Sequence, residues 1–315
     1  MLGWREHLIR ADEIVRSGSP GAFYRAERAG RFVRVAHGIH LPRRIWDELD
    51  AEQRYLLRVH IVGERWPDAV FSHASAAALW GLPRLGPWPE RPEVLADAAT
   101  GGRSRVAVTR HTEGVPGATA VVLGLRVTTL ARTVVDVART GSLTAGVVAV
   151  DAALAPGNGA TASADHLLQE LVDHPSARGR SRAFAALELG DGRSQSVGES
   201  VSRASMYRLG FHMPELQKEF VDDQGSMWVD FWWPELNLVG EFDGETKYTD
   251  PAMLRGRTTA EVLVAEKWRE DRLRALGLGV VRWGWDVATS LPLLRARLSA
   301  AGLRDRRAHS AMRAK

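Results

Sequence analysis

Residues 227–247 have the sequence MWVDFWWPELNLVGEFDGETK. Two segments dense in Trp, Phe and Val, residues 227–233 and 238–243, predict two short β-strands. The residues between them, 234–237, start with Pro234 at a strand end and predict a tight turn. The stretch therefore predicts an antiparallel hairpin, and the centre of its turn decides which residues face each other.

The predicted register gathers acidic side chains. If the hairpin is symmetric about residues 235 and 236, Asp230 lies opposite Glu241, and Asp243 follows two residues along on the same face. Directly opposed Cβ atoms are about 4.5–5.5 Å apart, and like charges there are destabilising. Three carboxylates on one face therefore require a cation, and their hard oxygens suit Mg²⁺ or Mn²⁺. The apolar neighbours of Asp230 predict that it is partly buried. The alternative is a surface hairpin whose acids are only solvated.

The order of these acids resembles the core of the PD-(D/E)xK nucleases. The strings VDFWWPELNLVGEFDGETKY (229–248) and EKWREDRLRALGLGVVRW (266–283) resemble the very-short-patch-repair (Vsr-like) branch, over roughly residues 195–286. The resemblance implies a restriction-endonuclease-like domain, with a mixed sheet flanked by helices, that hydrolyses DNA. It also implies that Asp230, Glu241 and Asp243 bind the metal.

Two further positions follow from the resemblance. Asp243 stands where the family motif carries a lysine, which leaves Lys247 and, on the following helix, Lys267 as candidates for the group that serves the attacking water. Glu199 lies near the start of an expected helix, where the family often carries an acid that reaches the metal. An acid that favours the helix dipole explains Glu199 equally well.

The N-terminal region predicts a winged helix-turn-helix over residues 1–45. Residues 10–16 and 21–29 predict two short helices, and residues 32–41 alternate apolar and polar side chains as a small hairpin does. Its basic side chains would meet the major groove and the phosphates of DNA. These candidates are Arg25, Arg28, Arg31, Arg34 and His37. The alternative is a winged-helix module that contacts protein, with arginines that are only solvated.

Residues 46–155 predict an α/β region. With the winged helix, the strings SHASAAALWGLP (72–83) and TTLARTVVDVA (128–138) resemble the AbiEi-type antitoxins of type IV toxin–antitoxin systems, over roughly residues 5–155. That resemblance implies DNA binding, regulation of the protein's own operon and a cognate toxin as partner. His73 and Asp136 lie in largely apolar helical contexts and are interpreted as structural.

The rest of the chain divides into a linker with helices (156–190), the nuclease-like domain (191–303) and a basic tail (304–315). The 315 residues carry a net charge of +4, and the tail, with five basic residues against one acid, accounts for it. Cysteine is absent, which excludes disulfides and Cys-based zinc sites. No apolar window is long enough for a membrane span, and no signal-peptide core is present, so a cytoplasmic location is expected.

The function expected from the sequence is that of a DNA-binding protein with a Mg²⁺- or Mn²⁺-dependent endonuclease domain, acting in defence or DNA repair. The alternative is an antitoxin-like transcriptional regulator whose nuclease fold is catalytically inactive.

Overall fold

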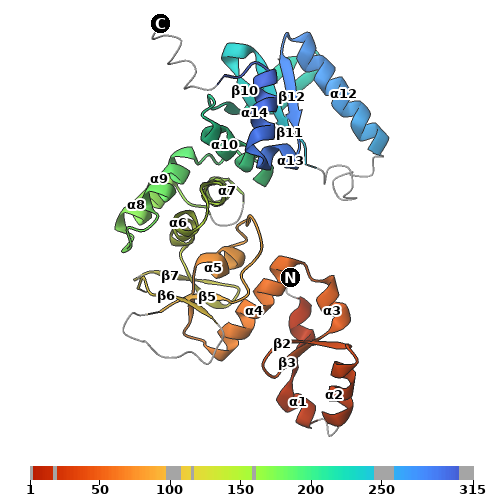
Figure 1. The fold of residues 1–315 in the computed structure, drawn as a ribbon, viewed down its shortest axis with the longest axis vertical. Coiled ribbons are helices and arrows are strands. Elements are labelled where there is room, and N and C mark those ends of the chain that lie inside the picture. Colours follow the sequence, from red (N-terminus) through yellow and green to blue (C-terminus); the bar gives the residue numbers. More distant parts are fainter. Residues whose placement is uncertain are drawn as a thin grey trace. The chain divides into compact units, whose positions relative to one another are not determined.

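The computed structural model describes residues 3–16, 20–96, 108–114, 117–157, 161–244 and 259–304. These residues form a mixed α+β fold with three separate sheets, which confirms the predicted class (Figure 1). The chain divides into two compact units, Met1–Val137 with Gln169–Arg178, and Ala138–Leu168 with Gly179–Lys315. The division falls inside helix α6, so it does not coincide with the predicted boundary at residue 155. Within the described ranges, no helix is long and apolar enough to cross a membrane.

The N-terminal part of the first unit contains a three-stranded antiparallel sheet with strand order β1-β3-β2. Its apolar core is built on Trp4, Ile39 and Leu41, and it also receives Leu57 and Ile61 from helix α4. The elements are η1 (Gly3–His7), β1 (Ile9–Arg10), α1 (Ala11–Arg16), α2 (Pro20–Arg28), β2 (Phe32–Ala36), β3 (Ile39–Pro42) and α3 (Arg43–Glu48).

The other part of the first unit holds a five-stranded mixed sheet with strand order β6-β5-β4-β8-β7. Helix α4 begins with a capping box formed by Asp50 and Gln53, and it contributes Tyr55 to the core of this part as well. The elements are α4 (Ala51–Arg65), β4 (Val70–Phe71), α5 (His73–Trp80), β5 (Glu93–Leu95), β6 (Thr109–His111), β7 (Thr119–Val122), β8 (Leu125–Thr128) and α6 (Leu130–Thr140).

The second unit begins with helices that pack closely. A Cβ atom added at Gly146 of α7 would lie 2.9 Å from the Cβ atom of Ala186 in α9, so only a glycine permits this approach. Arg203 of α10 forms a buried ion pair of 2.7 Å with Asp151 of α7. The helices are α7 (Leu143–Leu154), α8 (Ala164–Asp173), α9 (Arg180–Leu189) and α10 (Val197–Leu209). Helix α7 therefore packs with the nuclease-like region, although the sequence assigned it to the preceding domain.

The second unit also contains a four-stranded sheet with strand order β12-β11-β10-β9. Neighbouring strands are antiparallel except for β11 and β12, which are parallel. The elements are β9 (Glu215–Asp222), β10 (Gly225–Trp233), η2 (Pro234–Leu236), β11 (Leu238–Phe242), α12 (Thr259–Ala275), β12 (Gly279–Trp283), α13 (Trp285–Thr289) and α14 (Leu291–Ala300).

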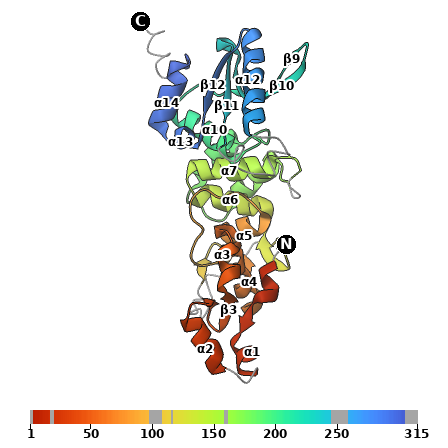
Figure 2. The same ribbon diagram turned by 90° about the vertical axis from the view of Figure 1, so that its right-hand side faces the viewer.

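Helices cover both faces of this sheet, with α12 on one face and α14 on the other (Figure 2). On the α12 side, Val229 of β10 packs with Leu273 of the helix. On the opposite side, Phe231 of β10 stacks on Trp283, whose indole N–H donates to the Ser202 hydroxyl of α10. Val229 and Phe231, the two neighbours of Asp230 in the strand, therefore pack on opposite faces of the sheet. Both faces of β10 are buried next to Asp230.

Candidate active site

The hairpin of β10 and β11 has the predicted register. Phe231 pairs with Gly240 and Trp233 pairs with Leu238, and this regular pairing ends one residue before Asp230 and Glu241. Asp230 is partly buried, as predicted. Its Oδ2 atom accepts a hydrogen bond of 2.8 Å from the backbone N–H of Phe242. The carboxylate thus binds the neighbouring strand where the two strands leave their regular pairing.

Glu241 lies in the middle of the sheet and is 4 % exposed. Its Oε2 atom forms an ion pair of 2.7 Å with Arg282, the residue that pairs with it on the parallel strand β12. Its Oε1 atom forms a second ion pair with Arg269 of α12. Burial raises the pKa of Glu241, while the two arginines lower it and Asp230 raises it further. Two guanidinium groups therefore provide the positive charge that the sequence led us to expect from a metal.

Arg282 connects Glu241 to further acids. Its guanidinium lies 3.8 Å from Asp243, 3.7 Å from Glu266 and 3.4 Å from Glu270, measured between the closest nitrogen and oxygen atoms. Asp243 thus reaches the predicted site through an arginine that it shares with Glu241. No role was predicted for Arg282.

Glu199 lies near the start of α10 and is buried. Its Oε1 atom accepts from the Ser196 hydroxyl at 2.8 Å, and its Oε2 atom accepts from the Gln195 N–H at 2.9 Å. The same Oε2 atom accepts from the amide of Gln217 at 3.1 Å, and that amide lies 3.5 Å from Asp230. Glu199 therefore caps the helix N-terminus and is linked to Asp230 through Gln217, and its contact with a metal stays a prediction.

The two candidate lysines differ in their position. Lys267 is exposed, and it makes no hydrogen bond or ion pair with any residue in the described ranges. Arg269 lies two positions later, about 200° around the helix, and this places Arg269 rather than Lys267 against Glu241. Lys247 lies outside the described residues.

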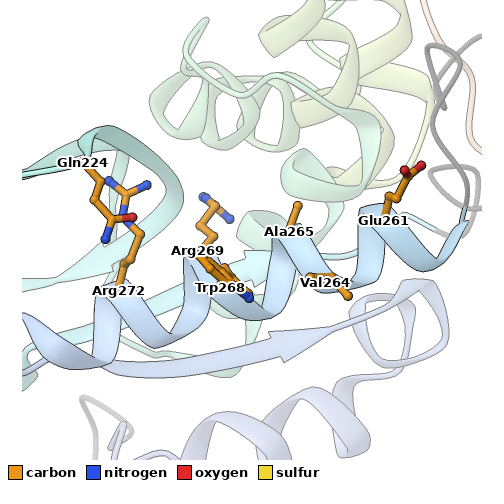
Figure 3. A pocket seen from close by; sticks show the side chains of 7 residues that line it. All are labelled: Gln224, Glu261, Val264, Ala265, Trp268, Arg269 and Arg272. Atoms are coloured by element: carbon orange, nitrogen blue, oxygen red, sulfur yellow. The ribbon is translucent and has the colours of Figure 1, made fainter.

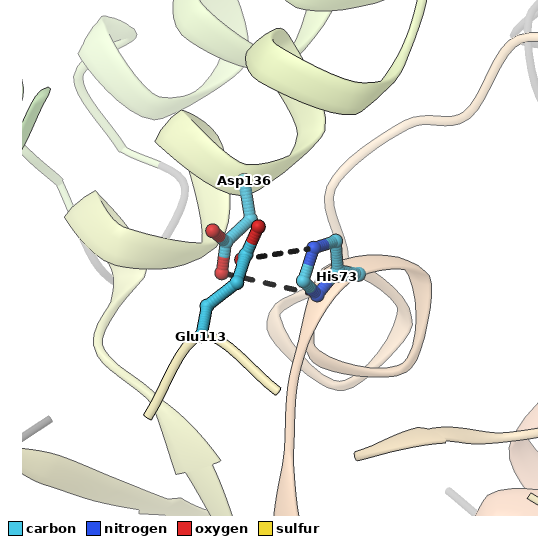
Figure 4. A group of neighbouring side chains, drawn as sticks. All are labelled: His73, Glu113 and Asp136. Carbon is cyan, nitrogen blue, oxygen red and sulfur yellow. Dashed lines mark ion pairs between the residues drawn. The ribbon is translucent and has the colours of Figure 1, made fainter. Parts of the chain in front are cut away.

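A second polar group lies in the first unit. His73, Glu113 and Asp136 each offer one ligand atom, and these atoms all lie within 4.8 Å of one another (Figure 4). The sequence interpreted His73 and Asp136 as structural residues in largely apolar helices, and the structure adds that α5 and α6 bring them together with other polar side chains. In the described ranges, Asp230, Glu241 and Asp243 do not form such a group.

The predicted DNA-binding side chains are exposed. They lie on α2, on the turn that follows it and on the β2–β3 hairpin. Arg34 contacts the ring of His37 at 2.8 Å, and within the described ranges no ion pair with an acid holds any member of this set. The set comprises Arg25, Arg28, Arg31, Arg34 and His37. Its charges are therefore available to an anionic partner.

A groove of about 480 Å³ runs along α12 beside Arg269 (Figure 3). Trp268, on its wall, is 66 % exposed. The groove is lined by Gln224, Glu261, Val264, Ala265, Trp268, Arg269 and Arg272. An aromatic surface next to guanidinium groups is a surface on which a base stacks while its phosphate is neutralised.

No family model matches the chain. The chain is 36 % identical over 142 residues to two uncharacterized proteins of Mycobacterium tuberculosis, Rv2248 of strain ATCC 25618 / H37Rv and MT2308 of strain CDC 1551 / Oshkosh. Each match covers 44 % of this chain and 50 % of the relative, so the chain spans about half the length of the curated relatives it matches. The crystal structure of the Rv2827c protein from M. tuberculosis matches 68 % of this chain and 83 % of its own, with 15 % identity and a TM-score of 0.37.

Proposed function

We propose that this protein binds DNA and hydrolyses its phosphodiester bonds with the help of a divalent metal ion. The observation that carries the proposal is the register of β10 and β11, whose last pair, Phe231 with Gly240, directly precedes Asp230 and the buried Glu241. The parallel pairing of β11 with β12 and the helices on both faces of the sheet support a PD-(D/E)xK-like, Vsr-like domain. The contact of Glu199 with Gln217 adds the helix acid that such a domain uses.

Asp230, Glu241 and Asp243 would hold the Mg²⁺ or Mn²⁺ ion. Their hard carboxylate oxygens suit either ion. Of the three, Glu241 most needs a neighbouring cation, because burying a carboxylate without one is costly. Arg269 and Arg282 now contact its two oxygens, so an ion at Glu241 would compete with them. Arg269 is the more exposed competitor, because its side chain is 33 % exposed, against 20 % for Arg282, and it borders the α12 groove.

When bound, the ion would polarise the scissile phosphate and lower the pKa of a water molecule. The chain's own residues would position the acidic ligands and neutralise charge on the phosphate. The Gln217 amide holds Asp230 in place, and Arg282 holds Glu241 and Asp243 close to each other. Arg269, once it leaves Glu241, can neutralise charge on the phosphate. Lys247 or Lys267 would orient the water; Lys267 is exposed and makes no hydrogen bond or ion pair within the described residues.

The N-terminal sheet and helices would hold the duplex as a winged helix. Exposed arginines on α2 and the β2–β3 hairpin support this, because Arg side chains bind both phosphates and guanine edges. The cytoplasm is the location expected for such a protein.

A second function is favoured by one observation. Both oxygens of Glu241 already have an arginine partner, so the carboxylate is balanced without a metal. In that case the protein is an antitoxin-like transcriptional regulator, with a cognate toxin as partner, and the nuclease-like domain is a silent platform.

The test is a cleavage assay on supercoiled plasmid with Mg²⁺, Mn²⁺ or EDTA, run beside a DNA gel-shift assay. Asp230→Asn removes the central acid at nearly constant shape. Glu235→Gln changes an exposed acid in the turn of the same hairpin and serves as the matched control. We expect metal-dependent nicking by the wild type and by Glu235→Gln, and none by Asp230→Asn. Binding without cleavage by the wild type would favour the regulator, and cleavage by clean Asp230→Asn would refute the site.

A further inference from the structure

The polar group around His73 in the first unit is a cluster of seven side chains that the proposed function does not use. They come from the start of α5, from β5 and β6, from the residues after β6, from α6 and from the segment after α8. We call it the histidine cluster, and it comprises His73, Glu93, His111, Glu113, Arg132, Asp136 and His174.

Asp136 is held in a fixed orientation. It is fully buried, and the Nε atom of Arg132 donates to its two oxygens at 3.0 and 3.1 Å. His174 lies 2.9 Å from its Oδ1 atom, and the backbone N–H of Ser176 donates to the other ring nitrogen of His174. His174 therefore carries its hydrogen on Nε2 and donates it to Asp136.

Hydrogen bonds do not satisfy both ring nitrogens of His73. The residue is 3 % exposed, and its Nδ1 atom contacts the Ser72 hydroxyl at 3.0 Å. Its Nε2 atom is buried and has no hydrogen-bond partner. Its backbone φ is +50°, a left-handed conformation that costs energy for a residue with a side chain. A strained and incompletely satisfied histidine in the core needs a compensating interaction.

The distances suit an ion better than direct hydrogen bonds. His73 Nε2 lies 3.9 Å from Glu113 Oε2, and His73 Nδ1 lies 3.9 Å from Asp136 Oδ2 (Figure 4). These separations are too long for hydrogen bonds. Zinc lies about 2.0–2.2 Å from an imidazole nitrogen or a carboxylate oxygen, so two ligands of one ion are separated by at most about 4.2 Å. A single ion therefore spans the gap between His73 Nε2 and Glu113.

The net charge of the histidine cluster also favours a bound cation. Within the histidine cluster, three carboxylates face one guanidinium, which leaves two negative charges if the imidazoles are neutral. The ring of His111 stacks on His73 with centroids 3.5 Å apart, an arrangement unfavourable for two charged rings. A metal ligand must be neutral imidazole, and a divalent ion cancels the remaining charge.

We propose that His73, Glu113 and Asp136 bind a divalent transition-metal ion, with Arg132 and His174 fixing Asp136 for it. Nδ1 already contacts the Ser72 hydroxyl, so Nε2, which faces Glu113, is the ligand atom of His73, and Asp136 belongs to the site because one ligand atom from each of the three residues lies within 4.8 Å of the others. One imidazole with two carboxylates suits Zn²⁺ or Mn²⁺ better than Mg²⁺. This site lies in the first unit and is independent of the proposed nuclease centre.

The experiment titrates full-length, EDTA-treated protein with Zn²⁺ by calorimetry and records the melting temperature with Zn²⁺ or Mg²⁺. His73→Asn removes the ligand, and Asn tolerates the left-handed backbone. Glu113→Gln removes a second, less buried ligand and keeps the test decisive if His73→Asn does not fold. His166→Gln, at an exposed histidine of α8, is the control. Asp230→Asn shows whether any binding belongs to the other centre.

We expect saturable Zn²⁺ binding and a higher melting temperature in the wild type, His166→Gln and Asp230→Asn, and no comparable effect of Mg²⁺. Changing a residue behind a ligand costs about 10–100-fold in affinity, so losing a ligand should cost about a hundredfold or more. The proposal is overturned if the wild type shows no saturable Zn²⁺ binding, or if His73→Asn and Glu113→Gln bind like the wild type.

Discussion

Replacing Arg282 with Met tests whether Glu241 depends on its arginines. Arg282 contacts Glu241 at 2.7 Å, and Met keeps much of the apolar stem while it removes the charge. Removing one partner of a buried ion pair typically costs about 3–5 kcal/mol. Arg282 is 20 % exposed and Arg269 still contacts Glu241, so we reduce this to about 1–2 kcal/mol.

The matched control is Arg274→Met. Arg274 pairs with Glu270 at 2.7 Å within α12, and its side chain is 55 % exposed. Exposed pairs of this spacing contribute about 0.3–0.5 kcal/mol. Urea unfolding followed by tryptophan fluorescence measures both losses, and the second unit contains several of the chain's tryptophans around this sheet.

The loss should depend on pH with a definite sign. Burial raises the folded-state pKa of Glu241 above its unfolded value, and without Arg282 the pKa rises further. A raised carboxyl pKa stabilises the fold at low pH and loses that contribution as pH rises through the folded value. Arg282→Met should therefore be least destabilising at about pH 4–5 and most destabilising near pH 8.

A double-mutant cycle with Glu241→Gln isolates the pair. In the Gln background, Arg282→Met should cost at least about 1 kcal/mol less than in the wild type, because no buried charge is left unbalanced. The reasoning is refuted if Arg282→Met costs no more than Arg274→Met, if its cost grows as pH falls, or if the cycle shows no coupling.

The remaining predictions concern DNA contacts and packing. Replacing Arg25, Arg28 and Arg34 together with Gln should weaken duplex binding and reduce its salt slope by roughly one unit per lost phosphate contact, as measured by fluorescence anisotropy at several salt concentrations; an unchanged slope would show that another surface binds the duplex. Gly146→Val should destabilise the second unit by about 1–3 kcal/mol in urea unfolding, because its Cβ atom would meet α9. Gly117→Ala, with open space around it, should change stability little, and equal losses would contradict the packing argument.

The β10–β11 hairpin could be predicted because its information is local. Aromatic and β-branched residues mark the two strands, and Pro234 marks the turn between them. The distance from the turn then predicted the register, and the structure has it for the three pairs from Phe231–Gly240 to Trp233–Leu238. The partner of Glu241 on its other side could not be predicted in this way, because β12 pairs with β11 in parallel after a long connection.

The arginines and the histidine cluster show the same limit. Arg269 is one of several charged residues on its helix. Which of them faces Glu241, Arg269 or Lys267, depends on how α12 is rotated about its axis against the sheet. His73 and Asp136 lie on different helices, and Glu113 lies on neither, so nothing within one stretch of sequence joins them. An acid or histidine within an apolar helix is a signal for such a cluster, because a buried polar group needs partners.

The most direct test of the proposed nuclease centre is a crystal soaked in Mn²⁺ and measured at a wavelength where manganese scatters anomalously. We predict an anomalous peak bounded by Asp230, Glu241 and Asp243, with the Arg269 guanidinium moved away from Glu241. A peak at His73 in the first unit would report the other proposed site and would not count. If Mn²⁺ saturates the crystal, and Arg269 and Arg282 still hold both oxygens of Glu241 with no peak beside Asp230, the metal-dependent mechanism is contradicted.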